Sequence, residues 1–348
     1  MSFLLKSDIK EICENIKYFR ADFEGKTILI TGASGFLGVY FLETFLLLNK
    51  NLKKPCKIIA VDNFLASEDI LKNFGSTENI KFIKHDINEP FQYDERIDYI
   101  INLAGLANPY FYKKFPLETI RVSTIGTENI LKLALKNDGC KVMMFSSSEV
   151  YGDPLKIPTT EDTPCQALPL GDRGVYDNGK IILETICKVY HQMGVHVVII
   201  RPFNVYGPNS NRFDFRVIPN FLTKIIANQH VSIYDSGQHT RTFCYVVDAI
   251  VGFTKALCKG KSGSAYNIGN PSPEISMLQL ANTMEKVLKI PVKKELIQYP
   301  SEYPSSQPNR RCPDISKAQK ELNYQPQISL EEGLKRFYGW AKENYTKE

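Results

Sequence analysis

Short apolar runs rich in β-branched residues alternate with stretches of helical periodicity between residues 26 and 202 of this 348-residue chain. Apolar runs without an alternating polar position are typical of strands that are buried on both faces of a parallel sheet. Helices between the strands cover the two faces, so the pattern predicts a doubly wound α/β fold. The predicted strands are KTILIT, KIIAVD, KFIKHD, DYIINLA, KVMMFSS and HVVIIRP.

A glycine-rich turn, TGASGFLG, follows the first predicted strand directly and carries Gly32, Gly35 and Gly38. Between a strand and a helix, the first glycine allows a tight turn and the second lets the backbone approach a pyrophosphate. The third lets the helix pack closely, and the N-terminus of that helix faces the anion. The turn therefore predicts a Rossmann dinucleotide site.

Asp62 ends the second predicted strand, where its carboxylate can accept a hydrogen bond from the adenosine ribose of NAD. The same carboxylate would repel the 2′-phosphate of NADP, and no arginine follows it to bind that phosphate. The sequence therefore predicts NAD as the cofactor. By position, the other residues expected at the cofactor site are Phe36, Leu37, Asn63, Asp86, Ile87, Leu103, Ala104 and Gly105.

The rest of the chain is predicted to form an N-terminal extension and a smaller lobe. The apolar spacing in residues 1–24 predicts a helix capped by Ser7. We expect this helix to serve in packing or in oligomer formation, and we assign it no chemistry. The NAD-binding Rossmann domain is expected at 25–203, with 240–270 returning to it. A discontinuous α/β substrate-binding lobe is expected at 204–239 and 271–348. Within these parts we expect a helix at 219–228, strands at 231–237 and 264–270, and helices with proline-rich interruptions from Ile275 onward.

Composition excludes several classes of function. The formal net charge of +5 comes without a basic run, which argues against nucleic acid as the main partner. The eight cysteines form neither a C-x-x-C pair nor a zinc-like spacing, and the N-terminus lacks an apolar signal core. No apolar run is long enough to span a bilayer. We expect a cytoplasmic protein with free thiols, without a metal site or a membrane partner.

The stretch RGVYDNGKIILET places Tyr176 and Lys180 one helical turn apart, so both side chains can reach one point. Together with the glycine triplet, the NLAG stretch and the strand end SSSEVYG, this Y-x-x-x-K pair resembles the extended short-chain dehydrogenase/reductases that act on nucleotide sugars. The resemblance covers Lys26 to about Leu334. It implies that Tyr176 is the acid/base for a sugar hydroxyl, that Lys180 holds the nicotinamide ribose, and that Ser147 shares the hydroxyl's hydrogen bond.

The chemistry of a phenol agrees with these roles. A free phenol titrates near pH 10, about three units too high for a base at neutrality. Lys180 and an oxidised nicotinamide would both favour the phenolate, so we expect the pKa of Tyr176 to be lowered. Gly179, between Tyr176 and Lys180, is expected to allow a close approach of backbone or ligand.

Within this family the residues after Ser147 separate the reactions. The 4,6-dehydratases carry an Asp where this chain has Ser148, so the acid for dehydration is missing here. The UDP-glucuronate decarboxylases resemble the chain in T-S-E-V-Y-G-D-P and Y-D-E-G-K. In that group a Ser-Glu pair and a late arginine surround the sugar carboxylate, which implies catalytic Ser148 and Glu149. The resemblance also implies substrate contacts at Asn204, Arg216, Val217, Arg241 and Arg311, and Tyr234 is expected to flank the base.

Four departures from the decarboxylase pattern weaken the assignment of substrate more than that of family: Ser147 for Thr, Asn178 for Glu, Phe215 for Gly and Cys312 for Lys. If Glu149 lies beside a substrate carboxylate, its pKa should be raised.

We therefore expect an NAD-dependent enzyme that oxidises a nucleotide sugar transiently at C4, with a UDP-sugar favoured, most like a UDP-glucuronate decarboxylase of polysaccharide biosynthesis. A 4-epimerase, a 4,6-dehydratase and a C4 dehydrogenase remain alternatives, as does a catalytically silent NAD-binding regulator or scaffold. We also expect a homodimer, because apolar stripes on helices near 119–135 and 176–190 suit a four-helix interface.

Overall fold

The computed structural model describes residues 4–65, 74, 77–212, 214–298 and 308–345. A seven-stranded sheet, in the order β11-β6-β5-β4-β1-β2-β3, forms its centre, and every neighbouring pair is parallel. The six predicted strands are confirmed, and the segment after residue 264 returns to the sheet edge beside β6 as predicted. The strands are β1 (Thr27–Thr31), β2 (Lys57–Asp62), β3 (Ile80–Lys84), β4 (Tyr99–Asn102), β5 (Lys141–Phe145), β6 (His196–Pro202) and β11 (Ala265–Ile268).

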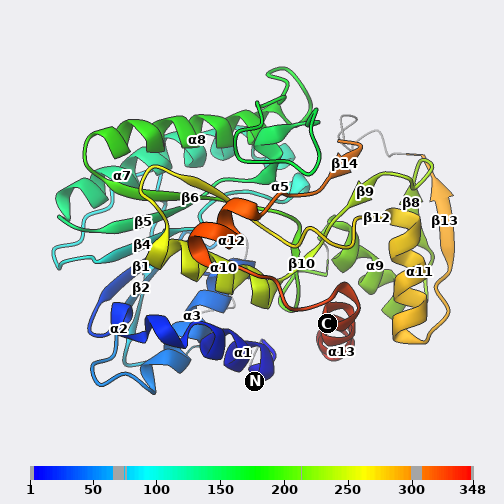
Figure 1. Cartoon of the computed structure of the whole chain (residues 1–348), viewed down its shortest axis with the longest axis horizontal. Helices are drawn as coiled ribbons and strands as arrows, with labels where there is room; N and C mark the ends of the chain where they lie inside the picture. The colour runs from blue at the N-terminus through cyan, green and yellow to red at the C-terminus, as the bar shows by residue number, and fades with distance from the viewer. Residues whose placement is uncertain (1–3, 66–73, 75–76, 213, 299–307, 346–348) are drawn as a thin grey trace.

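Helices cover both faces of the sheet, as the doubly wound prediction requires (Figure 1). Alternation along β1 divides the core: Leu29 belongs to the cluster under α7 and α8, whereas Ile28 and Ile30 belong to the cluster under α3 and α10. All five residues of β1 are buried, which explains the continuous apolar run. The covering elements are α3 (Phe36–Asn49), α5 (Pro109–Lys114), α6 (Pro116–Arg121), the π-helical turn η2 (Val122–Gly126), α7 (Thr127–Lys136), the short helix η3 (Ser148–Tyr151), α8 (Gly174–Gln192) and α10 (Val246–Lys259).

A smaller lobe lies at one end of the sheet, where α9, α11 and the parallel pair β8–β13 are grouped (Figure 1). The predicted helix at 219–228 and strand at 231–237 are confirmed as α9 and β8. The expectation of helices alone after Ile275 is wrong, because three short strands there pair with partners far away in sequence. The remaining elements are β7 (Val205–Tyr206), α9 (Val217–Ile226), β8 (Val231–Tyr234), β9 (Thr240–Arg241), β10 (Cys244–Tyr245), β12 (Ile275–Ser276), α11 (Met277–Leu288), β13 (Lys294–Ile297), β14 (Arg310–Arg311), α12 (Ser316–Leu322) and α13 (Leu330–Asn344).

The division into domains remains a prediction. α12 belongs to the expected substrate lobe by sequence, yet it packs on β11 of the main sheet and on α10. Within the described ranges, no helix has the length and apolar character needed to cross a bilayer. All eight cysteines are free.

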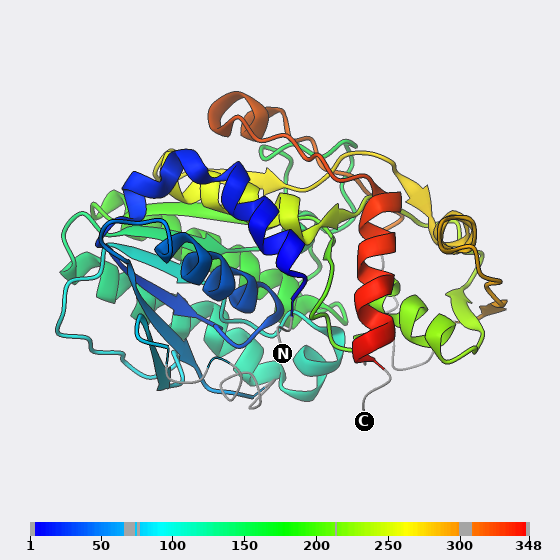
Figure 2. The same cartoon turned by 90° about the horizontal axis from the view of Figure 1, so that it is seen from below.

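The N-terminal segment forms α1 (Lys6–Asn15), η1 (Lys17–Phe19) and α2 (Arg20–Phe23). Its cap is Leu5, without a side-chain hydrogen bond, so the prediction of Ser7 is wrong: Ser7 already lies in the first turn. The apolar stripe packs α1 across α3 and α10 (Figure 2). The same face also buries Asp8, which accepts hydrogen bonds from Tyr245 Oη at 2.6 Å and from Arg336 at 3.2 Å. Asp8 therefore joins the extension to β10 and α13.

Replacing Asp8 by alanine should lower the free energy of unfolding by about 2 kcal/mol, because the buried Tyr245 hydroxyl loses a charged acceptor. Chemical unfolding of the whole chain measures the change. Glu14→Ala is the matched control on the same helix, since its ion pair with Lys17 is exposed and contributes little. Equal stability of the two variants would show that Asp8 does not anchor α1.

Candidate active site

The turn between β1 and α3 has the geometry of a pyrophosphate cradle. Gly32 has a φ of +65°, and a Cβ there would lie 2.7 Å from the backbone nitrogen of Ala104. A Cβ on Gly38 would lie 2.5 Å from the Gly32 oxygen, so both positions require glycine. At Gly35 a Cβ would meet only the Gly32 oxygen, at 3.2 Å, and the residue otherwise faces a cavity. These residues fit a dinucleotide phosphate bound at the N-terminus of α3.

Asp62 lies at the end of β2, beside this turn. Its two carboxylate oxygens accept hydrogen bonds from the backbone N–H groups of Ser34 at 2.9 Å and Phe64 at 2.8 Å. Asn63 donates to Asp86 at 3.3 Å, which places both near the expected adenine position. Contact of these groups with the adenosine remains a prediction. The predicted cofactor residues Asp62, Asn63, Asp86, Ile87 and Ala104 do not line the main cavity, and Ile87 is buried.

A cavity of about 420 Å³ extends from the glycine turn to the smaller lobe. It brings together the rest of the predicted cofactor residues and all of the predicted catalytic and substrate residues. Among its described lining residues, four arginines and one lysine are cationic, whereas Glu149 is the one carboxylate, a balance that favours an anionic ligand. The predicted residues that line it are Gly32, Gly35, Phe36, Leu37, Gly38, Leu103, Gly105, Ser147, Ser148, Glu149, Tyr176, Lys180, Asn204, Arg216, Val217, Tyr234, Arg241 and Arg311.

Tyr176 projects from the first turns of α8 and stacks on Tyr112 of α5, with ring centroids 5.5 Å apart. Burial raises the pKa of Tyr176 to about 12, although a hydrogen bond with Ser147 opposes the shift. The expectation of a lowered pKa is therefore wrong for the protein alone. The physical reason is that the low-polarity surroundings penalise the phenolate more than the polar neighbours stabilise it.

Lys180 lies one turn further along α8, with Nζ 5.8 Å from the Tyr176 ring centroid. Its Nζ donates to the Phe145 carbonyl at 2.8 Å, at the end of β5, and burial lowers the pKa of Lys180 to about 8. The glycine between them is explained by packing: a Cβ on Gly179 would lie 3.2 Å from the side chain of Ser123 in η2. The expected close approach at Gly179 is thus to a side chain of the neighbouring helix.

Glu149, on η3, is bonded to two arginines through one carboxylate oxygen. Its Oε2 accepts from Arg311 of β14 at 2.6 Å and pairs with Arg173 at the start of α8. Burial alone would raise the pKa of Glu149, but Arg173, Arg311 and Arg241 hold it below its ordinary value. The expected rise is therefore absent in the protein alone, since three cations outweigh desolvation.

Asp177 completes this network from the next turn of α8. Its Oδ2 lies 3.4 Å from Arg173 Nε, and burial, followed by the charge of Glu149, raises the pKa of Asp177 to about 7. Sequence reasoning missed both Arg173 and Asp177. Arg173 is the N-cap of α8 and Asp177 lies in its first turn, so their spacing of four was a weak signal until Glu149 was located.

The remaining substrate residues come from the smaller lobe. Arg216 pairs with the buried Asp214 and lies over the Phe36 ring at 5.8 Å, where the cofactor and substrate regions meet. Asn204 donates to the Thr242 carbonyl at 2.8 Å, and Arg241 donates to Thr240 and Asn309 carbonyls. Val217 begins α9, and Tyr234 ends β8 at the cavity wall.

Phe215, which departs from the family pattern, also lines the cavity. Its ring stacks with that of Tyr110 of α5, with centroids 6.1 Å apart, so the two lobes touch beside the cavity. Over the described part of the chain, no cluster of His, Cys, Asp or Glu side chains has the makeup of a metal site.

Comparison with known proteins assigns the family. The model of the NAD dependent epimerase/dehydratase family matches residues 28–269. The chain belongs to this family. It is 38% identical to UDP-glucuronic acid decarboxylase 6 of Arabidopsis thaliana over 322 residues, 92% of this chain and 89% of the relative.

Solved structures agree with the family assignment. An epimerase from Methanothermobacter thermautotrophicus matches with a TM-score of 0.81 and 27% identity, covering 95% of this chain and 96% of that one. A UDP-glucuronic acid 4-epimerase from Bacillus cereus, in complex with UDP-glucuronic acid and NAD, matches with a TM-score of 0.77 and 26% identity. It covers 91% of this chain and 99% of that one. The protein is thus an NAD-dependent enzyme, and the predicted cofactor, fold and family are confirmed.

The Asp177 carboxyl should make stability depend on pH. Its folded pKa of about 7 exceeds the ordinary value of 3.8, so the folded protein holds a proton that the unfolded chain releases. The free energy of unfolding therefore falls as the pH rises from about 4 to about 7.

Asp177→Asn should remove part of this fall, on the order of 2 kcal/mol. Chemical unfolding across the same pH range measures the slope, with the exposed Asp162→Asn as control. An unchanged slope in Asp177→Asn would mean that Asp177 is already ionised in the folded protein below neutrality.

Proposed function

We propose that this enzyme is a UDP-glucuronate decarboxylase that oxidises its sugar transiently at C4. The observation that carries the proposal is the group of arginines around Glu149, in the same cavity as Tyr176, Lys180 and Ser147. Guanidinium groups bind carboxylates with two parallel hydrogen bonds, so Arg311 suits the C6 carboxylate of a uronic acid. The curated relative named above is a decarboxylase of that substrate class, which supports the assignment.

The residues of the cavity divide the reaction into steps. Tyr176, oriented by Ser147, takes the proton of the C4 hydroxyl, and Lys180 Nζ lies 5.8 Å from the centroid of its ring. NAD held at the turn that carries Gly32, Gly35 and Gly38 would supply the hydride acceptor for C4 and the hydride donor for the final reduction. The C4 ketone then lies β to the C6 carboxylate, so the C5–C6 bond breaks and its electron pair passes through C5 to the ketone oxygen.

Arg311 has a second role in this scheme. It holds the C6 carboxylate while the C4 ketone forms, and neutral carbon dioxide loses that attraction as it departs. Glu149, ionised between its arginines, disfavours a second anion nearby and so favours the neutral product. Ser148 replaces the acid that a 4,6-dehydratase needs, which argues against dehydration.

A 4-epimerase of UDP-glucuronate is the second candidate. The Bacillus cereus structure shows that this fold holds UDP-glucuronic acid together with NAD in an enzyme named as an epimerase. Arginines that bind the C6 carboxylate would be needed for epimerisation and for decarboxylation alike, so they do not separate the two reactions. Release of carbon dioxide from UDP-glucuronate, followed by mass spectrometry, separates them, since an epimerase retains C6.

Replacing Tyr176 by phenylalanine should lower turnover of UDP-glucuronate by at least about 10²-fold, because only the acid/base hydroxyl is lost. NAD binding, measured by calorimetry, should stay within about twofold of the wild type. Tyr190→Phe, at the other end of α8, is the control. Near-normal turnover in Tyr176→Phe would place the proton acceptor elsewhere.

Replacing Arg311 by alanine should weaken binding of UDP-glucuronate by about 10- to 100-fold, the value of a hydrogen bond to a charged group. Binding of UDP-glucose, which lacks the carboxylate, should change by less than about threefold. Calorimetry with both sugars tests this. Arg310→Ala is the neighbouring control, because Arg310 pairs with Glu274 and does not line the cavity. Equal losses for both sugars would assign Arg311 to the nucleotide or to packing.

We further propose that the enzyme is a homodimer through α6, η2, α7 and α8. These elements pack side by side and expose large apolar side chains, more than a solvated surface requires. Two such helical rows per subunit suit a two-fold four-helix contact. The exposed side chains are Leu117, Ile125, Leu135, Ile182, Val189 and Met193.

Val189→Arg should convert the dimer into monomers, because two arginines would meet across the two-fold contact without partners. Light scattering at micromolar concentration measures the mass. Leu296→Arg is the matched control, an exposed leucine of β13 in the other lobe. A wild-type protein that is monomeric under these conditions would contradict the dimer.

A further inference from the structure

A second cavity, of about 230 Å³, adjoins the first on the far side of the Glu149–Arg173 ion pair. Glu149 and Arg173 line both cavities, whereas Asp177 lines the second and is absent from the lining of the first. The ion pair is therefore the partition between the two spaces. The volume and the polar walls give room for several hydrogen-bonded waters.

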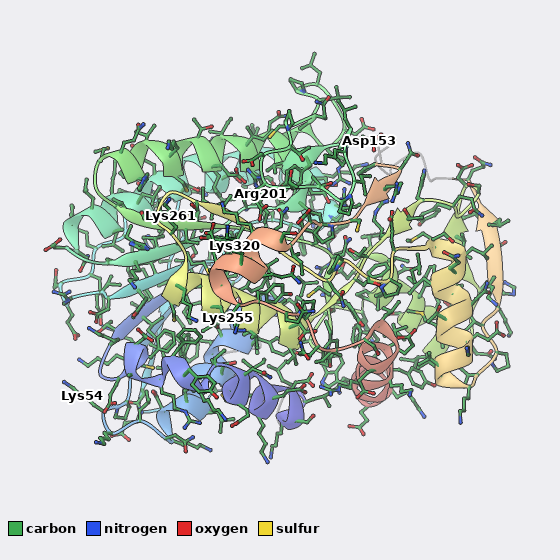
Figure 3. The ribbon with its side chains drawn as sticks, viewed as in Figure 1. Lys54, Asp153, Arg201, Lys255, Lys261 and Lys320 are labelled. Carbon is green, nitrogen blue, oxygen red and sulfur yellow. The ribbon has the colours of Figure 1, made fainter. Side chains whose placement is uncertain are left out.

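The second cavity leads from solvent to a buried carboxyl. Its outer wall includes Asp153, Gln166 and Leu168, which are exposed, and Asp153 accepts from the backbone of Asn309 beside β14 (Figure 3). Its inner end is Asp177, whose Oδ1 is buried and has no hydrogen-bond partner among the described protein atoms. An oxygen of this kind requires a water or a proton of its own.

The reaction proposed above needs a proton that the substrate does not supply. When the C5–C6 bond breaks, C6 leaves as carbon dioxide and the electron pair stays on C5 and the C4 oxygen. C5 must then gain one proton. The proton that Tyr176 takes from the C4 hydroxyl returns to the C4 oxygen in the final reduction, so the C5 proton comes from solvent, one per turnover.

We propose that the second cavity is the route by which this solvent proton reaches C5, carried by Asp177 and then by bridging waters that pass beside Glu149. The inference rests on the proposed decarboxylase function. Asp177 lines the second cavity and the Glu149–Arg173 ion pair lines both, so a proton on Asp177 is separated from the first cavity by this ion pair. The raised pKa of Asp177, about 7, suits a group that gains and loses a proton at neutrality.

Other charged groups around Asp177 fit this role. Arg173 of the same helix and Arg311 of β14 oppose protonation, whereas the charge of Glu149 favours it. Asp177 then acts as a relay residue that does not line the cavity proposed for the sugar, and Glu149 stays ionised beside it.

The test uses the full-length enzyme with NAD and UDP-glucuronate, and follows carbon dioxide and UDP-pentose separately in single turnovers. In the wild type both should form at the same rate. In Asp177→Asn, carbon dioxide release should stay within about threefold of the wild type, whereas UDP-pentose formation should fall at least about tenfold. The enolate should then leave the enzyme, take its C5 proton from bulk solvent and accumulate as a UDP-4-keto-pentose, with the hydride from C4 left as an equal amount of NADH.

Three further samples keep the test decisive. Asp177→Glu, or added imidazole buffer with Asp177→Asn, should restore UDP-pentose, because each supplies an acid. Ala167→Leu adds bulk to the wall of the second cavity without removing a charged group. It should slow UDP-pentose formation more than carbon dioxide release, as Asp177→Asn does. Asp162→Asn, an exposed carboxylate on the same loop that lines neither cavity, is the control.

The failures are distinguishable. A wild type that releases no carbon dioxide overturns the proposed function and the relay with it. A wild type that decarboxylates while Asp177→Asn and Ala167→Leu form UDP-pentose at its rate overturns the relay alone. A parallel loss of both products, without rescue by imidazole or Asp177→Glu, assigns Asp177 a structural role and also overturns the relay.

Discussion

One buried carboxylate, Glu149, fixes the relation between the parts of the active site. It follows β5 of the central sheet, and its two arginine partners come from α8 and from β14 of the distant C-terminal segment. A buried carboxylate without partners would be costly, so its position requires both cations. Because Tyr176 lies three residues after Arg173, the ion pair that orients Arg173 also sets the start of the catalytic helix relative to Ser147.

The fold could be predicted because its signals are local. A strand buried on both faces needs a continuous apolar run, and each such run became a strand of the sheet. The cofactor turn could also be predicted from the sequence. Gly32 and Gly38 pack so closely against backbone atoms that a Cβ at either position would clash, so both positions require glycine. The strands β12 and β14 were missed because two-residue strands carry no periodicity and form only where the folded chain brings a partner alongside.

Candidate catalytic residues that share one cavity could be named from the sequence, but their electrostatics could not. Tyr176, Lys180 and Ser147 do meet in one cavity, yet the pKa of Tyr176 is raised rather than lowered, because its burial is a property of the packed structure. Burial also lowers the pKa of Lys180 to about 8, which weakens the cation expected to assist it. Arg173 went unnoticed for a related reason: a single arginine before a helix signals nothing until its partner, Glu149, is located.

The same ion pairs explain how a substrate carboxylate could bind in the cavity without leaving either Glu149 or the substrate as an unpaired buried charge. A uronic acid that binds Arg311 takes one of the two partners of Glu149. Arg173 would remain paired with the same oxygen of Glu149, so the carboxylate would stay paired while Arg311 turns to the sugar. A site with a single arginine would have to leave either Glu149 or the substrate unpaired in a buried space, at a cost of several kcal/mol. The second arginine is therefore what makes the exchange of partners possible in a buried cavity.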